Sequence, residues 1–430
     1  IDRVRQYRET QGEKKEREGE GMIKFGKTVV KFRIPILILS FLLLIPAGIS
    51  YINTRINYDI LSYLPGDIDT MKGQDILLED FGTGAFSLCV VEDMSEKQVV
   101  DLENEIKGVE HVKDVIWYDT LADISIPMDV LPSEIKDAFN NEDKNATLMI
   151  VTFDTSMSAD ETLDAIEQLR TLTKQQCFMS GMSAVVTDIK KICNSEAIAY
   201  VILAAGLSAV VLALTMDSFL VPVFFLLSIG MAIIYNLGTN FVSGEISFIT
   251  QALAAVLQLA VTMDYSIFLW HSYQENQERF PGDKKRAMAH AISNTVSSVV
   301  ASSVTTVAGF VAMCFMTFTL GLDLGIVMAK GVVLGVLCCV TVLPAMILTF
   351  DGALEKTRHR ALIPKFDKMG TFATRKFPIF LVLFVVILIP AVYGYRNTNV
   401  YYDLAGTLPA DLESVQANNK LEEDFNMGAT

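Results

Sequence analysis

Histidine, tryptophan and positive charge are scarce in this sequence of 430 residues. It has four histidines, two tryptophans, and 35 Lys and Arg against 50 Asp and Glu, which gives a formal net charge of -15. No nucleophile motif or metal-ligand spacing accompanies the histidines, which are dispersed at His111, His271, His290 and His359. The acidic balance argues against a nucleic-acid partner. The residues therefore predict neither an enzyme nor a metal site nor a bound organic cofactor.

Cysteine motifs are absent as well, and one apparent nucleotide motif lacks its context. The six cysteines show no CxxC or zinc spacing, and nothing in the sequence supports a Cys89 to Cys177 bridge. Residues 21–28, GMIKFGKT, satisfy the phosphate-loop pattern GxxxxGK[ST]. We reject that reading because the pattern requires a preceding strand, whereas here it follows a charged, low-complexity run and leads into an apolar segment.

Apolar residues are abundant and occur in long blocks. They make up 51% of the chain, and the mean hydropathy is +0.38. A helix needs about 20 apolar residues to cross a bilayer, and seven segments meet that length. They are residues 34–52, 195–215, 218–238, 246–270, 289–316, 320–349 and 377–395. The pattern predicts an α-helical polytopic membrane protein with seven transmembrane helices.

Lysine and arginine predict the orientation of these spans. Basic residues concentrate before the first span, between the fourth and fifth, and between the sixth and seventh, so alternating spans place all three segments on the cytoplasmic face of a cell membrane. The predicted organisation is a cytoplasmic tail (1–33), a first span (34–52), an extracytoplasmic domain (54–192), a five-span bundle (193–350), a cytoplasmic linker (351–376), a seventh span (377–395) and a second outer segment (396–430). Residues 1–21 are charged and low in complexity, and a natural start at Met22 is one interpretation.

The polar insert between the first two spans carries the acidic surplus. Residues 54–195 contain 27 acidic and 11 basic residues. Alternating and apolar runs predict strands at 85–91, 112–118, 146–153 and 175–179, with helices at 95–107 and 159–171. This β-α-β, β-α-β order predicts a ferredoxin-like α+β domain, with an insertion near 132–139 between its halves. The helix after Gly181 should continue into the second span as one stalk.

The fourth span contains a single charged side chain, Asp264, among the 25 residues from Ile246 to Trp270. A carboxylate there costs roughly 2.5 to 3.5 kcal/mol on insertion scales, so we expect it to face a bundle interior or a wet cavity and to have a function. Desolvation favours the protonated form of a carboxyl group, and a Tyr hydroxyl can exchange hydrogen bonds with it. The pattern predicts a proton relay at Asp264 and Tyr265. The alternative for Asp264 is a neutral carboxyl that joins two helices, and the alternative for Tyr265 is an aromatic residue that only packs.

Two further spans carry polar residues that could support such a relay or a close helix contact. In the fifth span they recur on one helical face, at Asn294, Ser298, Ser302, Thr305 and Gly309. Tight packing is the alternative to a wet path for this stripe. The sixth span contains Lys330, a candidate partner for Asp264. At about 1.5 Å per residue, the two lie in opposite halves of the membrane, so direct pairing needs a long reach or a shifted helix. The alternative for Lys330 is an ordinary snorkelling residue.

The end of the chain repeats an earlier part. Residues 53–85 and 397–429 share 13 identities in 33 positions, including YD, LPxD and EDFxxGA. A match of this length predicts two parallel halves, each a span, an outer domain and further spans. We therefore expect residues 396–430 to begin a second outer domain that this chain truncates, with about five more spans to follow.

These motifs together resemble the resistance-nodulation-division superfamily and, within it, the MMPL (mycobacterial membrane protein large) transporters. The resemblance rests on TMDYSIFL in the fourth span, SSVTTVAGF in the fifth and GIVMAKGVVLG followed by LPA in the sixth. The five-span unit also looks like a sterol-sensing domain. The resemblance implies that Asp264 and Tyr265 belong to a proton relay, whose counterpart pair lies beyond Thr430.

The resulting hypothesis is a proton-driven exporter of hydrophobic or amphiphilic molecules, such as lipids or drugs, with protons as the coupling ion and no other cofactor. Its partners would be the bilayer and its cargo. The sequence leaves open whether the protein forms a homo-oligomer. Two alternatives remain: a lipid- or sterol-sensing receptor or scaffold without transport, and an accessory subunit of protein export.

Overall fold

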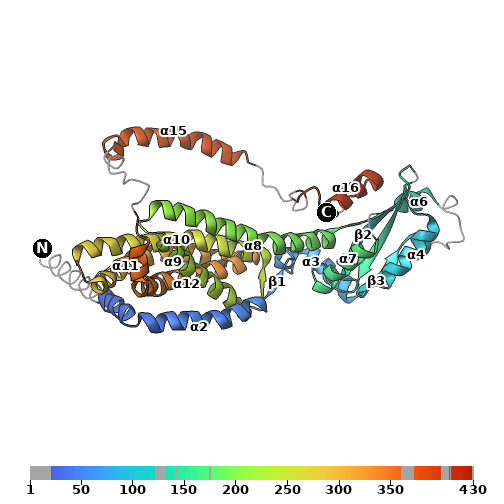
Figure 1. Ribbon diagram of the computed structural model, residues 1–430. Helices are drawn as coiled ribbons and strands as arrows, with labels where there is room; N and C mark the ends of the chain where they lie inside the picture. Colours follow the sequence, from blue (N-terminus) through green and yellow to red (C-terminus); the bar gives the residue numbers. More distant parts are fainter. Residues whose placement is uncertain are drawn as a thin grey trace.

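The computed structural model describes residues 21–121, 132–141, 143–173, 176–359, 372–398, 406 and 408–428. A helical bundle and an α/β domain lie at opposite ends of the long helix α8, Met182–Thr215 (Figure 1). Among these described residues, seven helices are long and apolar enough to cross a membrane, which confirms the predicted number of spans. They are α2 (Arg33–Ile52), α8, α9 (Leu220–Gly238), α10 (Phe248–Arg279), α11 (Lys284–Met313), α12 (Leu320–Thr349) and α15 (Phe377–Arg396).

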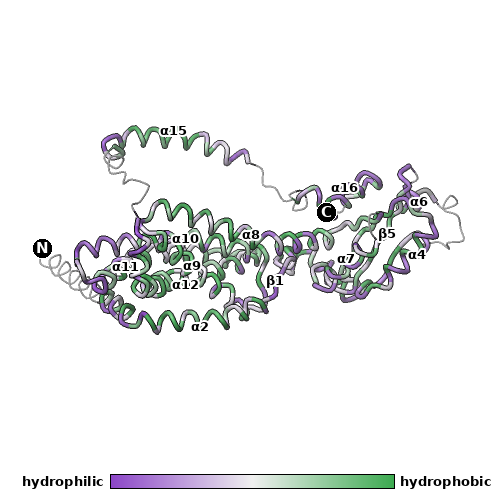
Figure 2. Tube along the Cα trace, viewed as in Figure 1, coloured by the Kyte–Doolittle hydropathy of each residue, from purple (hydrophilic) through white to green (hydrophobic). Residues whose placement is uncertain are grey.

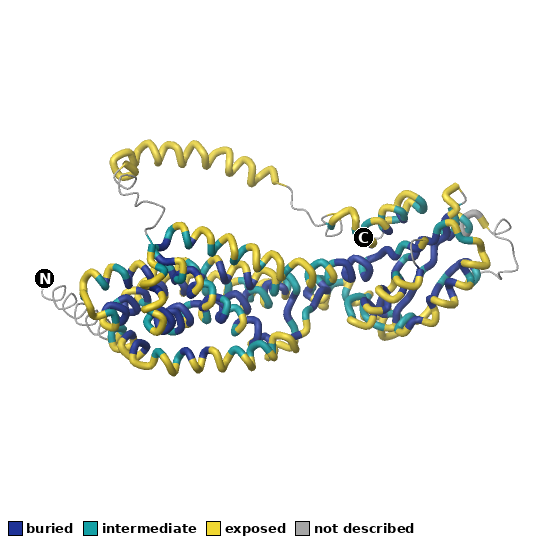
Figure 3. Tube along the Cα trace, in the orientation of Figure 1, coloured by how far each residue is buried: buried dark blue, intermediate teal, exposed yellow. Residues whose placement is uncertain are grey.

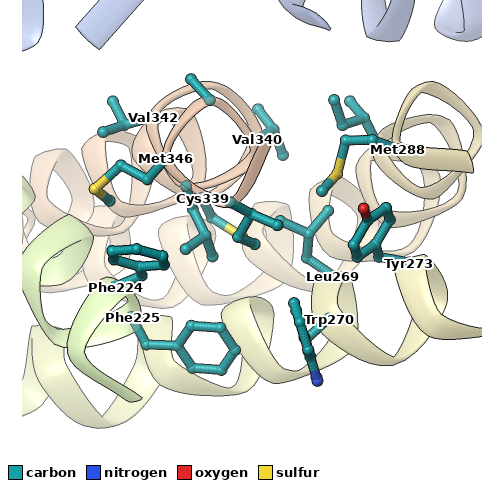
Figure 4. Packing of buried hydrophobic residues seen from close by; sticks show 14 of the residues in the cluster. Phe224, Phe225, Leu269, Trp270, Tyr273, Met288, Cys339, Val340, Val342 and Met346 are labelled. Carbon is teal, nitrogen blue, oxygen red and sulfur yellow. The ribbon is translucent and has the colours of Figure 1, made fainter. Parts of the chain in front are cut away.

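Helix α12 lies at the centre of the bundle and packs against α2, α9, α10 and α11. Glycine permits the closest approach: a Cβ atom on Gly335 would lie 2.1 Å from Cγ2 of Thr262 on α10. Figure 4 shows the buried side chains that fill the space between α9, α10, α11 and α12, among them Phe225, Leu269 and Cys339. Apolar side chains on both the inner and outer faces give these helices a mostly hydrophobic trace (Figure 2), as expected for helices in lipid.

Helix α15 differs from the other six because it has no buried residue. It stands apart from the bundle and is exposed along its whole length (Figure 3). Exposure of so apolar a helix to water on every side is unfavourable. Its partners must therefore be lipid, or protein that is absent from the described residues.

The α/β domain has the ferredoxin-like arrangement that the sequence predicts. Its main strands are β2 (Ala85–Glu92), β3 (Val112–Ile116), β5 (Ala146–Phe153) and β6 (Cys177–Ser180). Their order is β3-β5-β2-β6, and every neighbouring pair is antiparallel. Helices α4 (Glu96–Lys107) and α7 (Asp160–Thr173) complete the two β-α-β units. The buried core includes Trp117, Phe153 and Ile166.

Smaller elements lie within the α/β domain and in the segments that join it to the bundle. The predicted insertion contains α6 (Ser133–Phe139) and β4 (Asn140–Asn141), which pairs with β5. Gly181, with a φ of +104°, makes the turn between β6 and α8, and α8 continues unbroken as the predicted stalk. Strands β1 (Arg55–Asn57) and β7 (Glu245–Ser247) pair in parallel where α2 ends and α10 begins. Cys89 and Cys177 are free and buried.

The remaining short elements are η1 (Leu61–Tyr63), α3 (Asp69–Glu79), α5 (Tyr118–Leu121), η4 (Thr239–Val242), α13 (Asp351–Lys356) and α16 (Glu413–Phe425). Helices α3 and α16 begin 344 residues apart, at the offset of the sequence repeat. Helix α16 packs on β6, where Ala417 and Leu421 are fully buried and Lys420 forms an ion pair with Glu92. Helix α3 has no buried residue. The start of the second repeat therefore completes the domain of the first.

Candidate functional site

The predicted relay residues lie in the middle of α10, one of the longest helices of the bundle. The side chain of Ser247 caps the helix by accepting a hydrogen bond from the backbone N–H of Ile249, 3.3 Å away. No proline interrupts the 32 residues that follow. The helix therefore holds its side chains at fixed angular positions, about 100° apart for consecutive residues.

This geometry separates Asp264 from Tyr265. Asp264 is exposed, and no hydrogen bond or ion pair is formed by its side chain within the described residues. Tyr265 is 7% exposed and belongs to the apolar core of the bundle. The two side chains therefore form no hydrogen bond with each other within the described residues, because adjacent residues on a helix point in different directions. Their role in a proton relay stays a prediction.

Within the described residues, Asp264 does not face the interior of the bundle, and its place in a wet cavity or against a second bundle stays a prediction. It lies on an exposed stripe of α10 that is otherwise apolar for several turns, together with Leu253, Leu257, Ala260 and Phe268. Their spacing of three or four residues places them along one helical face. The neighbours of α10 pack on its other side, where Gln258, Thr262 and Ser266 are buried. The carboxylate thus occupies the centre of a face that no described residue covers.

The small polar stripe of α11 is uncovered too. Asn294, Ser298, Ser302, Thr305 and Gly309 are all exposed, so no described residue packs tightly on this stripe. Tight packing and a wet path both stay predictions. Helices α10 and α11 pack against each other, joined by the short turn at 280–283. At 1.5 Å per residue, Asp264 and Ser298 each lie roughly 20 Å from that turn. The carboxylate and the middle of the polar stripe therefore lie at the same depth.

Lys330 does not pair with Asp264. Its Nζ donates to Oδ1 of Asn240, which lies in η4 just after the end of α9. The contact joins α12 to the end of the bundle nearest the α/β domain, as the distance along the helices predicted. In this chain Lys330 supports a helix contact, and its role in a relay stays a prediction.

A buried polar cluster between α9, α10 and α12 was missed by the sequence reasoning. Asn236 is fully buried and its Nδ2 donates to Oε1 of Gln258, 3.1 Å away. Gly331 on α12 leaves room for the pair, because a Cβ there would lie 2.6 Å from Asn236 Nδ2. Oδ1 of Asn236 and Nε2 of Gln258 have no hydrogen-bond partner among the residues that the structure describes. A search for amides inside apolar spans, as well as charges, would have found both residues.

Charged side chains gather at the end of the bundle that lies farthest from the α/β domain. Lys284 forms ion pairs with Asp351, at 2.6 Å, and with Glu355. The hydrogen bond from Lys284 lowers the pKa of Glu355. Asp217 accepts a hydrogen bond from Trp270 Nε1 at 3.1 Å. These residues line a cavity of about 170 Å³. No group of three or more metal-ligating side chains occurs in the part of the chain that the structure describes.

Comparison with known proteins decides the family. The model of the MMPL family matches residues 88–376, which span the α/β domain and five of the membrane helices. The chain belongs to the MMPL family. This places it in the resistance-nodulation-division superfamily, as the motifs in its fourth to sixth spans indicate.

Relatives of this MMPL chain occur in bacteria and archaea. It is 25% identical over 328 residues to "Probable transport protein MmpL12" of Mycobacterium tuberculosis, covering 72% of this chain and 28% of the relative. It is 24% identical over 312 residues to the membrane protein SCO5905 of Streptomyces coelicolor, covering 67% and 36%. It is 24% identical over 355 residues to the membrane protein MJ1562 of Methanocaldococcus jannaschii, covering 73% and 90%.

Length separates these relatives into two groups. The MMPL chain spans about a third of SCO5905 and MmpL12 but most of MJ1562. A crystal structure of SecDF in its super-membrane-facing form matches 76% of this chain and 39% of its own, with 13% identity and a TM-score of 0.40. A likeness at that level carries no weight for function.

Proposed function

We propose that this chain forms the first half of a proton-driven membrane transporter that exports hydrophobic or amphiphilic molecules. The observation that supports the proposal most directly is the position of Asp264, the one charged residue at the middle of an uncovered apolar face. A carboxylate in contact with hydrocarbon is strongly unfavourable, whereas a carboxylate against protein or water inside a membrane marks an ion pathway. The uncovered face must therefore acquire a polar partner.

The second repeat is the partner that fits this face. The chain begins a second copy of the pattern at residue 397, and α15 is an apolar helix with no buried residue. A second bundle packed on α10 and α11 would enclose Asp264 beside the polar stripe of Asn294, Ser298, Ser302 and Thr305. Small residues on that stripe allow helices to approach closely. In this arrangement protonation of Asp264 removes a buried charge and shifts the balance between two packings of the halves.

A groove on the apolar outer surface of the bundle favours the proposal of an apolar cargo. It lies between α11 and α12, has a volume of about 440 Å³, and is lined mainly by valines, including Val300, Val304 and Val336. Its polar member Ser303 donates its hydroxyl to the backbone carbonyl of Val299. A site with this lining selects by apolar area, at roughly 25 cal/mol per Å² buried, so acyl chains and other hydrocarbon groups fit it.

Replacing Asp264 with Asn in the full-length protein tests the proposal. Asn keeps the shape of the side chain but cannot release a proton, so proton-driven export from vesicles should fall at least about 100-fold, as for other essential proton-transfer groups. Glu275→Gln is the matched control, because Glu275 is also an exposed carboxylate of α10 but lies near the end of the helix. Export by Asp264→Asn at the wild-type rate, with the variant inserted normally, would exclude the relay.

A gradient experiment separates transport from sensing. If the protein acts as a receptor or scaffold, dissipating the proton gradient with a protonophore leaves its activity unchanged. If it exports, the same treatment abolishes accumulation of the cargo outside the vesicles. Co-purification with the protein-translocation channel would instead favour a role in protein export.

A further inference from the structure

A groove of concentrated positive charge lies at the end of the bundle opposite the α/β domain. It forms between the helical residues 21–31, the start of α2 and the start of α11, and its volume is about 1070 Å³. We call it the basic groove, and its cations are Lys24, Lys27, Lys31, Arg33, Lys285 and Arg286. The function proposed above uses none of them.

Tight packing holds the two sides of the basic groove together. A Cβ atom on Gly26 would lie 2.3 Å from the carbonyl oxygen of Ala289, so only glycine allows the two helices to approach this closely. Val29 and Val30 are 3% and 6% exposed and join the apolar core of the bundle. Helical residues 21–31 also exclude a phosphate loop at the GxxxxGK[ST] match, because the segment forms no loop.

The positive charge of the basic groove is not balanced by the described residues. Its one carboxylate, Asp283, caps α11 by accepting a hydrogen bond from the backbone N–H of Arg286 at 3.0 Å. Within the described ranges, none of the six cations forms an ion pair with a carboxylate. Nε of Arg33 is buried and has no acceptor. Like charges held in one groove repel, so the site gains stability when an anion enters it.

The surroundings of the groove indicate which anion. It lies where α2 enters the apolar part of the bundle, and exposed apolar side chains flank its lysines: Phe25 is 41% exposed, Phe32 47% and Ile34 53%. A helix with Lys and Arg on its polar face and Phe or other apolar residues on the opposite face is typical of the membrane interface. The described residues leave a large part of each ring of Phe25 and Phe32 uncovered, and acyl chains would cover it.

The geometry points to a binding site for the phosphate headgroup of an anionic phospholipid in the basic groove. The cations of both helices contact the phosphate, and Arg33 supplies the buried donor. The acyl chains descend along α2 past Phe32 and Ile34. A bound lipid would then fasten residues 21–31 to α11 and fix the entry of the first span. The inference does not depend on proton coupling.

Native mass spectrometry of the full chain in detergent micelles tests the site with three probes: phosphatidylglycerol, phosphatidylcholine and inorganic phosphate. The test variant is Lys27→Gln, Lys285→Gln, Arg286→Gln. The matched control is Lys356→Gln, Arg375→Gln, Lys376→Gln, which removes the same charge from exposed residues between α12 and α15. Removal of three groove cations should weaken phosphatidylglycerol binding at least about tenfold, and the control should bind it as the wild type does.

Each probe has an outcome that decides the question. Tighter retention of phosphatidylglycerol than of phosphatidylcholine, lost only in the groove variant, supports the site. Equal retention of the two lipids, or equal loss in both variants, overturns it. Inorganic phosphate that displaces phosphatidylglycerol at equal concentration would make a free anion the ligand and also overturn the lipid assignment. The groove variant relieves repulsion, so its thermal unfolding temperature should be no lower than that of the control, which excludes misfolding as the cause of lost binding.

Discussion

Replacing Asp188 with Ala should release α16 from the α/β domain. Asp188 lies in the first turns of α8, and its side chain is 3% exposed. Its two oxygens accept hydrogen bonds from Nη1 and Nη2 of Arg170 on α7, at 2.7 and 3.2 Å. Oδ2 also accepts from the backbone N–H of Ser414 at 2.9 Å, at the start of α16. One carboxylate thus joins both repeats.

The magnitude follows from what the substitution leaves behind. Removing one partner of a buried ion pair costs about 3 to 5 kcal/mol, because the other charge stays buried and unpaired. Arg170 is 11% exposed and keeps one neighbour, Glu413, whose Oε2 lies 3.0 Å from Nε without hydrogen-bond geometry. Glu413 is 61% exposed, so solvent screens this pair. Because Glu413 still compensates part of the charge of Arg170 in spite of this screening, we expect a loss near the lower limit, about 3 kcal/mol, which corresponds to roughly 100-fold.

Hydrogen–deuterium exchange of the full chain in micelles measures this loss. Protection of backbone amides in α16 should fall roughly 100-fold in Asp188→Ala, because exchange there reports local opening. Asp164→Ala is the matched control: it removes a carboxylate that is 66% exposed and lies 3.9 Å from Lys190, so the change should be below about 1 kcal/mol.

A double variant distinguishes the unpaired charge from lost packing. Arg170→Met with Asp188→Leu removes both charges, and apolar replacement of a buried pair is often neutral. Most of the protection of α16 should therefore return. The reasoning would be refuted if the double variant exchanged as fast as Asp188→Ala, or if Asp164→Ala exchanged equally fast.

Two further predictions concern pH and helix packing. Burial, and then the charge of Glu92, raise the pKa of Asp424 on α16; the docked state holds the proton more tightly, so protection of α16 should increase as the pH falls through that raised pKa and decrease as it rises through it. Asp424→Asn should abolish this dependence in hydrogen exchange, and an unchanged pH profile would contradict the assignment. Gly335→Ala should destabilise the bundle by about 1 to 3 kcal/mol through its clash with Thr262. Gly206→Ala on α8, where a Cβ meets nothing within 4 Å, should not lower the thermal unfolding temperature, and equal losses in both variants would argue against the clash.

The sequence by itself determined the elements and their order. Spans were recognised because the bilayer imposes a minimum apolar length on each helix, and the sheet order followed because two β-α-β units close in few ways. The repeat was visible in identities at a fixed offset, and α3 and α16 begin at that offset. These properties depend on local composition and on spacing along the chain, which the sequence contains directly.

Only the tertiary structure decided what each face contacts. The sequence located Asp264, Tyr265 and Lys330. The packed bundle buries Tyr265 and leaves Asp264 on the uncovered side, and Lys330 donates a hydrogen bond to Asn240. Periodicity fixes the angle between two residues of one helix but contains no information on which neighbour covers either of them. That choice depends on contacts between helices far apart in sequence, such as the approach of α12 to α10 that Gly335 permits.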